Sequence, residues 1–296
     1  MTAERKPLDA RAFGLMVLLT ALWGFQQVTI KVAAADVSLV MQAAIRSIIA
    51  TLLLLGWAHA RGIALFRRDG TLGPGLLAGL LFGGEFVFIY AGLAHTAASR
   101  MIVFIYLTPA LTALGVHWLV PGERLALRQW TGVAVAFAGL TLAFAEGFSS
   151  AQGATFLGDL FGVIAAVLWA ATTVLIRAST LARITATKAL FYQLWVSALV
   201  LLAASLLMGE PGVVAVTPLA LASLAYQGVI VAFASYLAWF WLLTRYLAGR
   251  LAVFSFLAPL FGVIFGVWLL DEPLTPSFAG AALLVGAGIV LVNLRR

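Results

Sequence analysis

Two ionisable residues lie inside long apolar runs of the sequence, where a charge is costly. At 1.5 Å per helical residue, Glu85 lies about 20 Å into one run, and Arg46 lies about 14 Å into the preceding run from its opposite end. Charged groups at such depths are functional candidates by default. Two interpretations stay open: a structural ion pair between Arg46 and Glu85, or a cavity in which Glu85 holds a substrate ammonium group or a coupling proton.

Aromatic residues in the middle of these runs could line the same cavity. Trp23 and Trp169 lie too deep for the belt of tryptophans at a membrane surface. Rings at this depth could stack on aromatic substrates or attract amines, although packing explains any one of them equally well. Polar side chains one turn beyond each Trp should face protein or water: Gln26, Gln27, Thr172 and Thr173. The predicted substrate-binding set is Trp23, Gln26, Glu85, Tyr90, Tyr106, Trp169 and Thr173.

Prolines and glycines in the runs predict bends and close packing. Pro109 and Pro259 each remove a backbone hydrogen bond and free the carbonyl four residues earlier, so both helices should kink at mid-membrane. We predict that the two kinks act as gating hinges, although packing alone would also tolerate a proline there. Glycines spaced by four residues predict faces where helix backbones approach closely: Gly75, Gly79, Gly83, and also Gly262 and Gly266.

The composition requires lipid as the solvent. Of 296 residues, 64% are apolar and only 10% are charged, against roughly 25% charged in soluble domains. A helix needs about 20 apolar residues to cross the bilayer, and the chain can be divided into ten such runs. Their predicted limits are 12–34, 37–58, 72–94, 101–120, 129–145, 157–178, 189–208, 219–243, 251–270 and 277–294.

The cations between the runs predict the orientation. Cytoplasmic loops collect Lys and Arg, and with ten spans fifteen cations fall on one side, whereas only Lys31 and Arg100 fall on the other. Both termini should therefore lie in the cytoplasm, and the protein should be a multi-pass protein of the cell membrane, which in a Gram-negative source is the inner membrane.

The two halves of the sequence resemble each other. A shift of 150 residues superposes Arg100 on Arg250 and Pro109 on Pro259. Glu123 and Glu272 also correspond, and we expect both to be caps or turn residues. We predict two copies of five spans, over residues 1–148 and 149–296. Because five is odd, the second copy enters the membrane from the other side, which is the arrangement of many secondary transporters.

These motifs resemble the EamA-type family of the drug/metabolite transporter superfamily. The similar features are Trp23-Gly24, a mid-span Pro in each half, and a Gly-Glu-x-Leu sequence followed by Gly, although Asp271 stands where the family usually has Gly. The resemblance implies an all-α fold of ten helices around a central cavity, and export of metabolites or drugs. In overall character the chain also resembles the YddG type of amino-acid exporter.

The sequence disfavours other classes of protein. Phosphate-binding loops of the Gly-x-x-x-x-Gly-Lys type, the His-Glu-x-x-His motif and the Gly-x-Ser-x-Gly motif are all missing. We expect no enzyme, no cofactor, no metal site and no nucleic-acid partner; the expected partners are the bilayer and a small molecule, with a monomer as the working assumption. The predicted function is secondary export of amino acids, including aromatic ones, by alternating access. The alternatives are an exporter of cationic drugs or other metabolites, or a channel-like facilitator.

Overall fold

The computed structural model describes residues 7–96, 98–145, 156–271 and 276–294. Within these ranges the chain is helical, and the only extended pairing is an isolated bridge between Val37 and Val213. The elements are α1 (Ala10–Ala33), α2 (Leu39–Ala60), α3 (Leu72–Leu93), α4 (Ala98–Ile105), α5 (Thr108–Leu119), α6 (Leu127–Ala143), α8 (Phe156–Ala178), η1 (Thr180–Arg183), α9 (Ala186–Leu207), α10 (Pro218–Ala225), η2 (Tyr226–Ser235), α11 (Tyr236–Arg245), α12 (Ala248–Ala252), η3 (Val253–Phe256), α13 (Leu257–Leu270) and α14 (Phe278–Asn293).

Side-chain caps set several helix starts. Asp9 precedes α1, and its carboxylate accepts the backbone N–H of Ala12 at 2.9 Å. Thr185 precedes α9 and Thr217 precedes α10, and their hydroxyls accept the N–H groups of Lys188 and Ala220. These contacts satisfy donors that a helix leaves open in its first turn.

Eight helical segments are long and apolar enough to cross a membrane: α1, α2, α3, 100–119, α8, α9, 218–245 and 248–270. The other two predicted spans correspond to α6, with 17 residues, and α14, with 16. At 1.5 Å per residue these helices measure only about 25 Å, against about 30 Å of hydrocarbon. The chain is therefore a multi-pass membrane protein, and the crossing by α6 and α14 stays a prediction.

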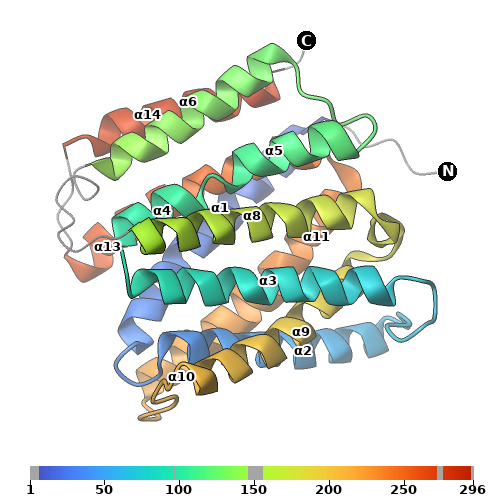
Figure 1. The fold of residues 1–296 in the computed structure, drawn as a ribbon, viewed down its shortest axis with the longest axis vertical. Helices are drawn as coiled ribbons and strands as arrows, with labels where there is room; N and C mark the ends of the chain where they lie inside the picture. The colour runs from blue at the N-terminus through green and yellow to red at the C-terminus, as the bar shows by residue number, and fades with distance from the viewer. Residues whose placement is uncertain (1–6, 97, 146–155, 272–275, 295–296) are drawn as a thin grey trace.

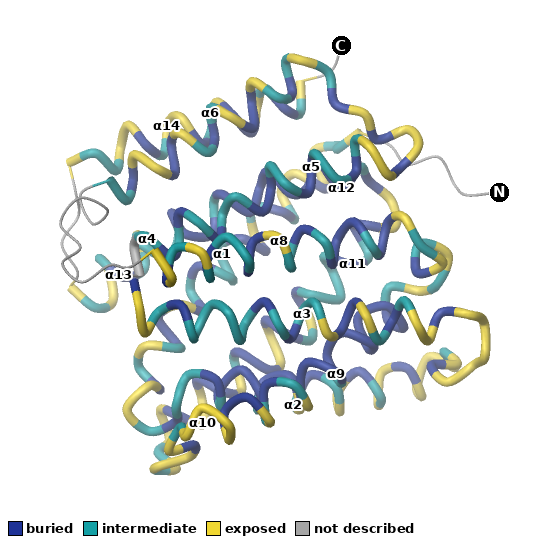
Figure 2. Tube along the Cα trace, in the orientation of Figure 1, coloured by how far each residue is buried: buried dark blue, intermediate teal, exposed yellow. Residues whose placement is uncertain are grey.

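The long helices pack side by side, and α6 and α14 form a pair at one edge (Figure 1). Helix α3 packs on both α8 and α9, α2 packs on α9, and α1 packs on α13. Figure 2 shows that buried residues line the faces between helices, whereas exposed residues lie on outer faces and in loops. Leu52, Trp118 and Leu283 are 63%, 73% and 76% exposed, as expected for side chains that contact lipid.

Glycines allow this close packing. A Cβ atom added to Gly75 would lie 2.5 Å from the Tyr192 ring, and one added to Gly79 would lie 2.5 Å from Cβ of Val196. Gly83 faces Val200 in the same way, so the spacing of four residues in α3 forms its contact with α9. The predicted packing role of these three glycines is confirmed.

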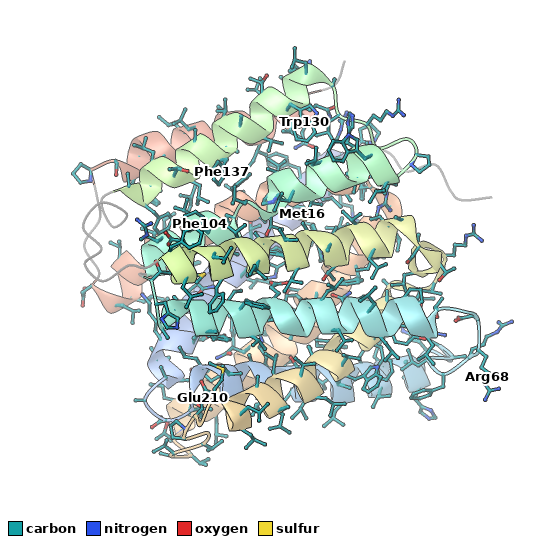
Figure 3. The ribbon with its side chains drawn as sticks, viewed as in Figure 1. Met16, Arg68, Phe104, Trp130, Phe137 and Glu210 are labelled. Atoms are coloured by element: carbon teal, nitrogen blue, oxygen red, sulfur yellow. The ribbon has the colours of Figure 1, made fainter. Side chains whose placement is uncertain are left out.

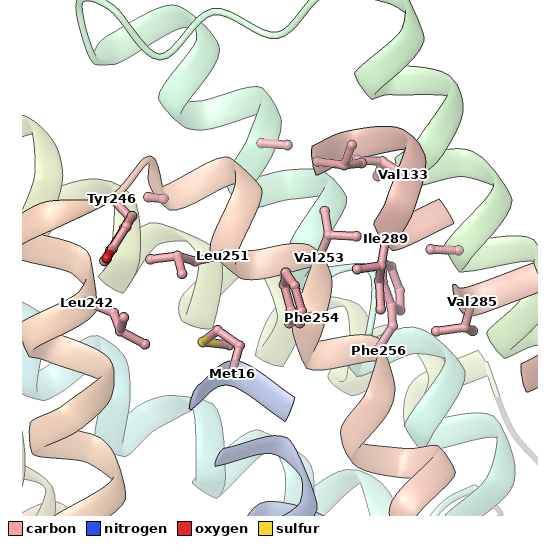
Figure 4. Close-up of a cluster of buried hydrophobic side chains, with 14 of the residues drawn as sticks. Met16, Val133, Leu242, Tyr246, Leu251, Val253, Phe254, Phe256, Val285 and Ile289 are labelled. Carbon is pink, nitrogen blue, oxygen red and sulfur yellow. The ribbon is translucent and has the colours of Figure 1, made fainter. Parts of the chain in front are cut away.

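The largest buried apolar cluster joins residues that are far apart in the sequence. Met16 of α1 lies among Tyr246, Leu251 and Phe254, and the cluster extends through Phe256 to α6 and α14 (Figure 4). This cluster fixes the broken helix α12–η3–α13 against the rest of the bundle.

The two loops that carry Arg67, Arg68 and Arg124 lie at one end of the bundle (Figure 1). Arg68 and Glu210 mark opposite ends (Figure 3). The α2–α3 loop, the α5–α6 loop and the start of α1 lie at the end of Arg68 (Figure 1). These segments carry the contacts of Asp69 with Lys188, of Glu123 with Arg177 and of Asp9 with Tyr246. We call this the basic end. Helix α1 begins at this end. Helix α14 ends here too: Arg128, at the start of α6, donates a hydrogen bond to the carbonyl of Leu294, which directly follows α14, at 2.6 Å.

Candidate functional site

Arg46 of α2 and Glu85 of α3 are both buried, each with 3% of its surface exposed. No salt bridge or hydrogen bond joins them, so the predicted ion pair is not formed in this structure. Instead, the guanidinium carbon of Arg46 lies 4.5 Å from the centroid of the Phe86 ring, a cation–π contact. The Oε2 atom of Glu85 is buried and has no hydrogen-bond partner among the described residues.

Three tyrosines pack against the part of α3 that carries Glu85. Tyr90 stacks on Phe86, the ring that Arg46 covers. The Tyr236 ring meets Phe82, one turn earlier in α3, edge-on with centroids 6.0 Å apart. Tyr106 packs in the apolar cluster that also contains Phe88 and Ile89 of α3. Each of the three tyrosines is partly buried and keeps part of its surface accessible. The structure thus places Tyr90 and Tyr106 in the same part of the bundle as Glu85, and their role in binding stays a prediction. We call Arg46, Glu85, Tyr90, Tyr106 and Tyr236 the central cluster.

Both predicted tryptophans adjoin the central cluster. The Trp23 indole Nε1–H donates to the Ser235 hydroxyl at 2.9 Å, and its ring meets the Tyr236 ring edge-on with centroids 6.3 Å apart. Trp169 meets Tyr106 in the same geometry at 5.9 Å. Each half of the chain thus contributes one tryptophan that packs on one tyrosine of the cluster.

The polar side chains beyond the tryptophans are less clearly connected with the cluster. Gln26, Thr172 and Thr173 are buried, whereas Gln27 is exposed. The Thr172 hydroxyl donates to the carbonyl of Leu168 at 2.9 Å, which satisfies it within its own helix. The roles of Gln26 and Thr173 in binding stay predictions.

Both proline helices are interrupted where the sequence predicts it. Helix α4 ends at Ile105, and α5 begins at Thr108 with Pro109 in its first turn. The Thr108 hydroxyl donates at 2.6 Å to the Ile105 carbonyl that Pro109 leaves free. In the second half, a 3-10 turn over Val253–Phe256 precedes α13 and Pro259. The breaks are present, and their role as hinges stays a prediction.

Sequence reasoning missed Phe86, Ser235 and Tyr236. Ser235 ends a π-helix, Tyr226–Ser235, a rare geometry that often marks functional sites. No local motif predicts it. The 150-residue shift that aligns the prolines points to Ser235 and Tyr236, because it places them opposite Glu85 and its neighbour Phe86.

Glu123 has a larger role than the predicted cap or turn. Its carboxylate forms a buried salt bridge with Arg177 and also accepts the backbone N–H of Ala248 at 2.7 Å, which does cap α12. Arg177 in turn donates to the Leu243 carbonyl at 2.7 Å. The α5–α6 loop, α8 and the α11–α12 turn are joined in this way at the basic end. Glu272 lies outside the described residues.

A second contact at the basic end joins the α2–α3 loop to α9. The Lys188 ammonium group lies 2.8 Å from the Asp69 carboxylate, and this hydrogen bond lowers the pKa of Asp69 to about 2. A lowered pKa stabilises the fold at pH values above the ordinary pKa of a carboxyl group. This stability is lost as the pH falls through about 2. The contact therefore persists throughout the physiological pH range.

Apolar helices around a charged and aromatic centre define a membrane protein of the transporter class. The model of the EamA-like transporter family matches the chain twice, over residues 11–145 and 156–294. The chain belongs to this family, and the resemblance seen in the sequence is confirmed.

Known proteins are similar over nearly the whole chain. An "uncharacterized transporter" of Archaeoglobus fulgidus is 26% identical, with 98% of this chain and 99% of the relative covered. The transporter YvbV of Bacillus subtilis is 29% identical over 94% of this chain and 90% of its own. A "probable amino-acid metabolite efflux pump" of Escherichia coli is 25% identical, over 92% and 91%. A solved crystal structure with 22% identity superposes with a TM-score of 0.80, covering 97% of this chain and 99% of its own, which shows the shared fold.

Proposed function

We propose that this membrane transporter exports small metabolites, chiefly amino acids including aromatic ones, by secondary alternating access without ATP. One observation carries the proposal: the central cluster combines two unpaired charges with aromatic rings deep in the bundle. Such a site offers both polar anchors and a stacking surface to a small molecule. The E. coli efflux pump, similar in sequence over most of its length, supports the choice of amino acids.

We further propose ten spans in two inverted copies of five. The two matches of the family model support this arrangement. The contacts between the copies also occur in corresponding pairs: α3 packs on α8 as α10 packs on α1, and α5 packs on α8 as α13 packs on α1. Helix α3 likewise packs on α9 as η2 packs on α2, and the contacts of α2 with α9 and of α6 with α14 join equivalent helices, as a two-fold axis requires.

The proposed orientation places the basic end in the cytoplasm, following the rule that Lys and Arg collect there. Both chain ends then lie on the cytoplasmic side of the cell membrane. The Glu123–Arg177 pair closes this end, while the break at Tyr106–Leu107 separates α4 from α5 next to the central cluster. Tilting of α5 about this break would open the cluster to the cytoplasm, and its return would close it.

The first test is transport by purified protein in liposomes. We expect labelled phenylalanine to move with saturable kinetics and to exchange with unlabelled amino acids on the other side. The panel should include aliphatic amino acids and aromatic cations. Non-saturating flux would indicate a channel, preference for cations would indicate a drug exporter, and no flux of any compound after verified insertion would contradict the proposal.

Replacing Pro109 with alanine should slow turnover about five- to tenfold and change KM by less than about twofold. Alanine restores an N–H that can donate to the Ile105 carbonyl, so α4 and α5 can join into one stiffer helix. The estimate corresponds to one hydrogen bond of about 1 kcal/mol. Initial rates of exchange in liposomes measure the effect.

Pro74→Ala is the matched control for this prediction. Pro74 lies in the first turn of α3, where a helix leaves N–H groups unpaired in any case. Equal rates for Pro109→Ala and the wild-type protein would refute the hinge and leave the two prolines a packing role.

A further inference from the structure

Arg46 and Glu85 differ from the other charge pairs of the protein. Among the described residues, Glu123 and Arg177, Asp69 and Lys188, and Asp159 and Arg100 all form closed salt bridges. Arg46 and Glu85 are as deeply buried as the first of these pairs, yet they stay apart. Because a buried charge without a partner is costly, the open pair requires an explanation.

The local structure holds the two charges apart. The guanidinium group of Arg46 lies over the Phe86 ring, which itself stacks on Tyr90 with an interplanar angle of 26°. Glu85 and Phe86 are neighbours in α3, and successive helical residues point about 100° apart. An arginine that stacks on Phe86 therefore does not meet the carboxylate of Glu85 directly.

Both charged groups keep polar atoms that are neither hydrogen-bonded nor fully sealed from solvent. The nitrogens of the Arg46 guanidinium make no hydrogen bond with a described residue, and they are not among the buried atoms sealed from solvent. The same holds for Oε1 of Glu85, although its Oε2 is sealed. Each group thus keeps hydrogen-bonding capacity that no described residue uses.

We propose that Arg46 and Glu85 are the two anchors of a zwitterion site, in which Arg46 binds the carboxylate of an α-amino acid and Glu85 binds its ammonium group. The substrate completes the charge pair that the protein leaves open, and an arginine offers a planar fork that matches a carboxylate. Tyr106 and Tyr236, with Trp169 and Trp23 behind them, provide an aromatic surface for the substrate side chain. This assignment rests on the proposed function and defines its substrate class: a compound that carries both charges is selected over one that carries a single charge.

Three related compounds test the assignment: L-phenylalanine, phenethylamine, which lacks the carboxylate, and 3-phenylpropionate, which lacks the ammonium group. Each competes with labelled phenylalanine for transport in liposomes, and each is also tested for binding by the thermal shift of the purified protein. In the wild-type protein we expect phenylalanine to bind about 10- to 100-fold more tightly than either analogue, as expected for one charged hydrogen-bonded contact.

Each variant that removes a charge should abolish the selectivity for phenylalanine over one of the two analogues. Arg46→Gln should bind phenylalanine no better than phenethylamine, and Glu85→Gln should bind it no better than 3-phenylpropionate. Arg46→Lys keeps the charge without the fork and should give an intermediate affinity. Arg61→Gln is the matched control, because Arg61 follows the same helix at the basic end and stacks on Trp57 at 4.4 Å.

The outcomes separate this assignment from the proposed function. If the wild-type protein transports amino acids and all variants keep its order of preference, the zwitterion site is wrong and the transporter assignment stands. If Arg46→Gln does not fold, Arg46→Lys decides: unchanged selectivity refutes the site. If no amino acid or analogue is transported or bound by the wild-type protein, the proposed function fails as well.

Discussion

Replacing Arg177 with methionine is expected to lower the midpoint of thermal unfolding by on the order of 10 °C. The substitution leaves Glu123 charged and 3% exposed, without its cation. Removing one partner of a buried pair costs about 3–5 kcal/mol, and for a chain of this size each kcal/mol corresponds to about 2–4 °C. The loss of the contact with the Leu243 carbonyl adds to the effect.

A matched set of variants separates charge from packing in this prediction. Arg183→Met removes an exposed arginine only six positions along the chain and should change the midpoint little. Glu123→Leu combined with Arg177→Met removes both charges, and it should recover much of the stability lost by Arg177→Met alone. Thermal unfolding in detergent, followed by near-UV circular dichroism, measures all three. Equal midpoints for Arg177→Met and Arg183→Met would show that the buried pair does not stabilise the fold.

The apolar runs, the proline breaks and the glycine faces were predictable because each depends on local spacing. The glycines of α3 lie one turn apart, and the structure places Tyr192, Val196 and Val200 of α9 on that face. The break before Pro109 follows from one missing N–H group. The family itself was recognisable from Trp23-Gly24 and the repeated motifs, and its model matches both halves.

The pairing of charged side chains was not predictable in the same way. Depth in the bilayer suggested that Arg46 and Glu85 meet, but depth does not specify the direction in which each side chain points. The stacking of Arg46 on Phe86 decides the geometry. Glu123 was predicted only as a cap or turn residue, because its partner Arg177 lies 54 positions away, on a different helix. The π-helix that presents Ser235 and Tyr236 depends on tertiary packing and leaves no local motif.

Helices α6 and α14 show how a short apolar helix can be held in the bundle. A Cβ atom on Gly132 would lie 2.8 Å from the Gly288 carbonyl, and one on Gly139 would lie 2.8 Å from the Ala281 carbonyl. The backbones thus touch along the pair. In lipid, such close packing replaces the hydrophobic effect as the main attraction between helices.

Replacing Gly288 with alanine should therefore separate α6 from α14. The added Cβ would lie 2.5 Å from the Gly132 carbonyl oxygen and 2.6 Å from the backbone nitrogen of Ala136, and backbone atoms cannot move aside as a flexible side chain can. We expect a loss of about 3 kcal/mol, the upper range for overpacking, seen as a lower thermal midpoint and as cleavage by added protease near these helices.

Gly286→Ala, two positions away on the same helix, is the matched control. A Cβ atom there meets nothing within 4 Å, and alanine favours a helix by about 1 kcal/mol over glycine. The two substitutions make the same chemical change, so they should shift stability in opposite directions. If both variants are as stable as the wild-type protein, the contact between the two backbones does not hold α14, and its place in the membrane must depend on lipid or on a partner chain.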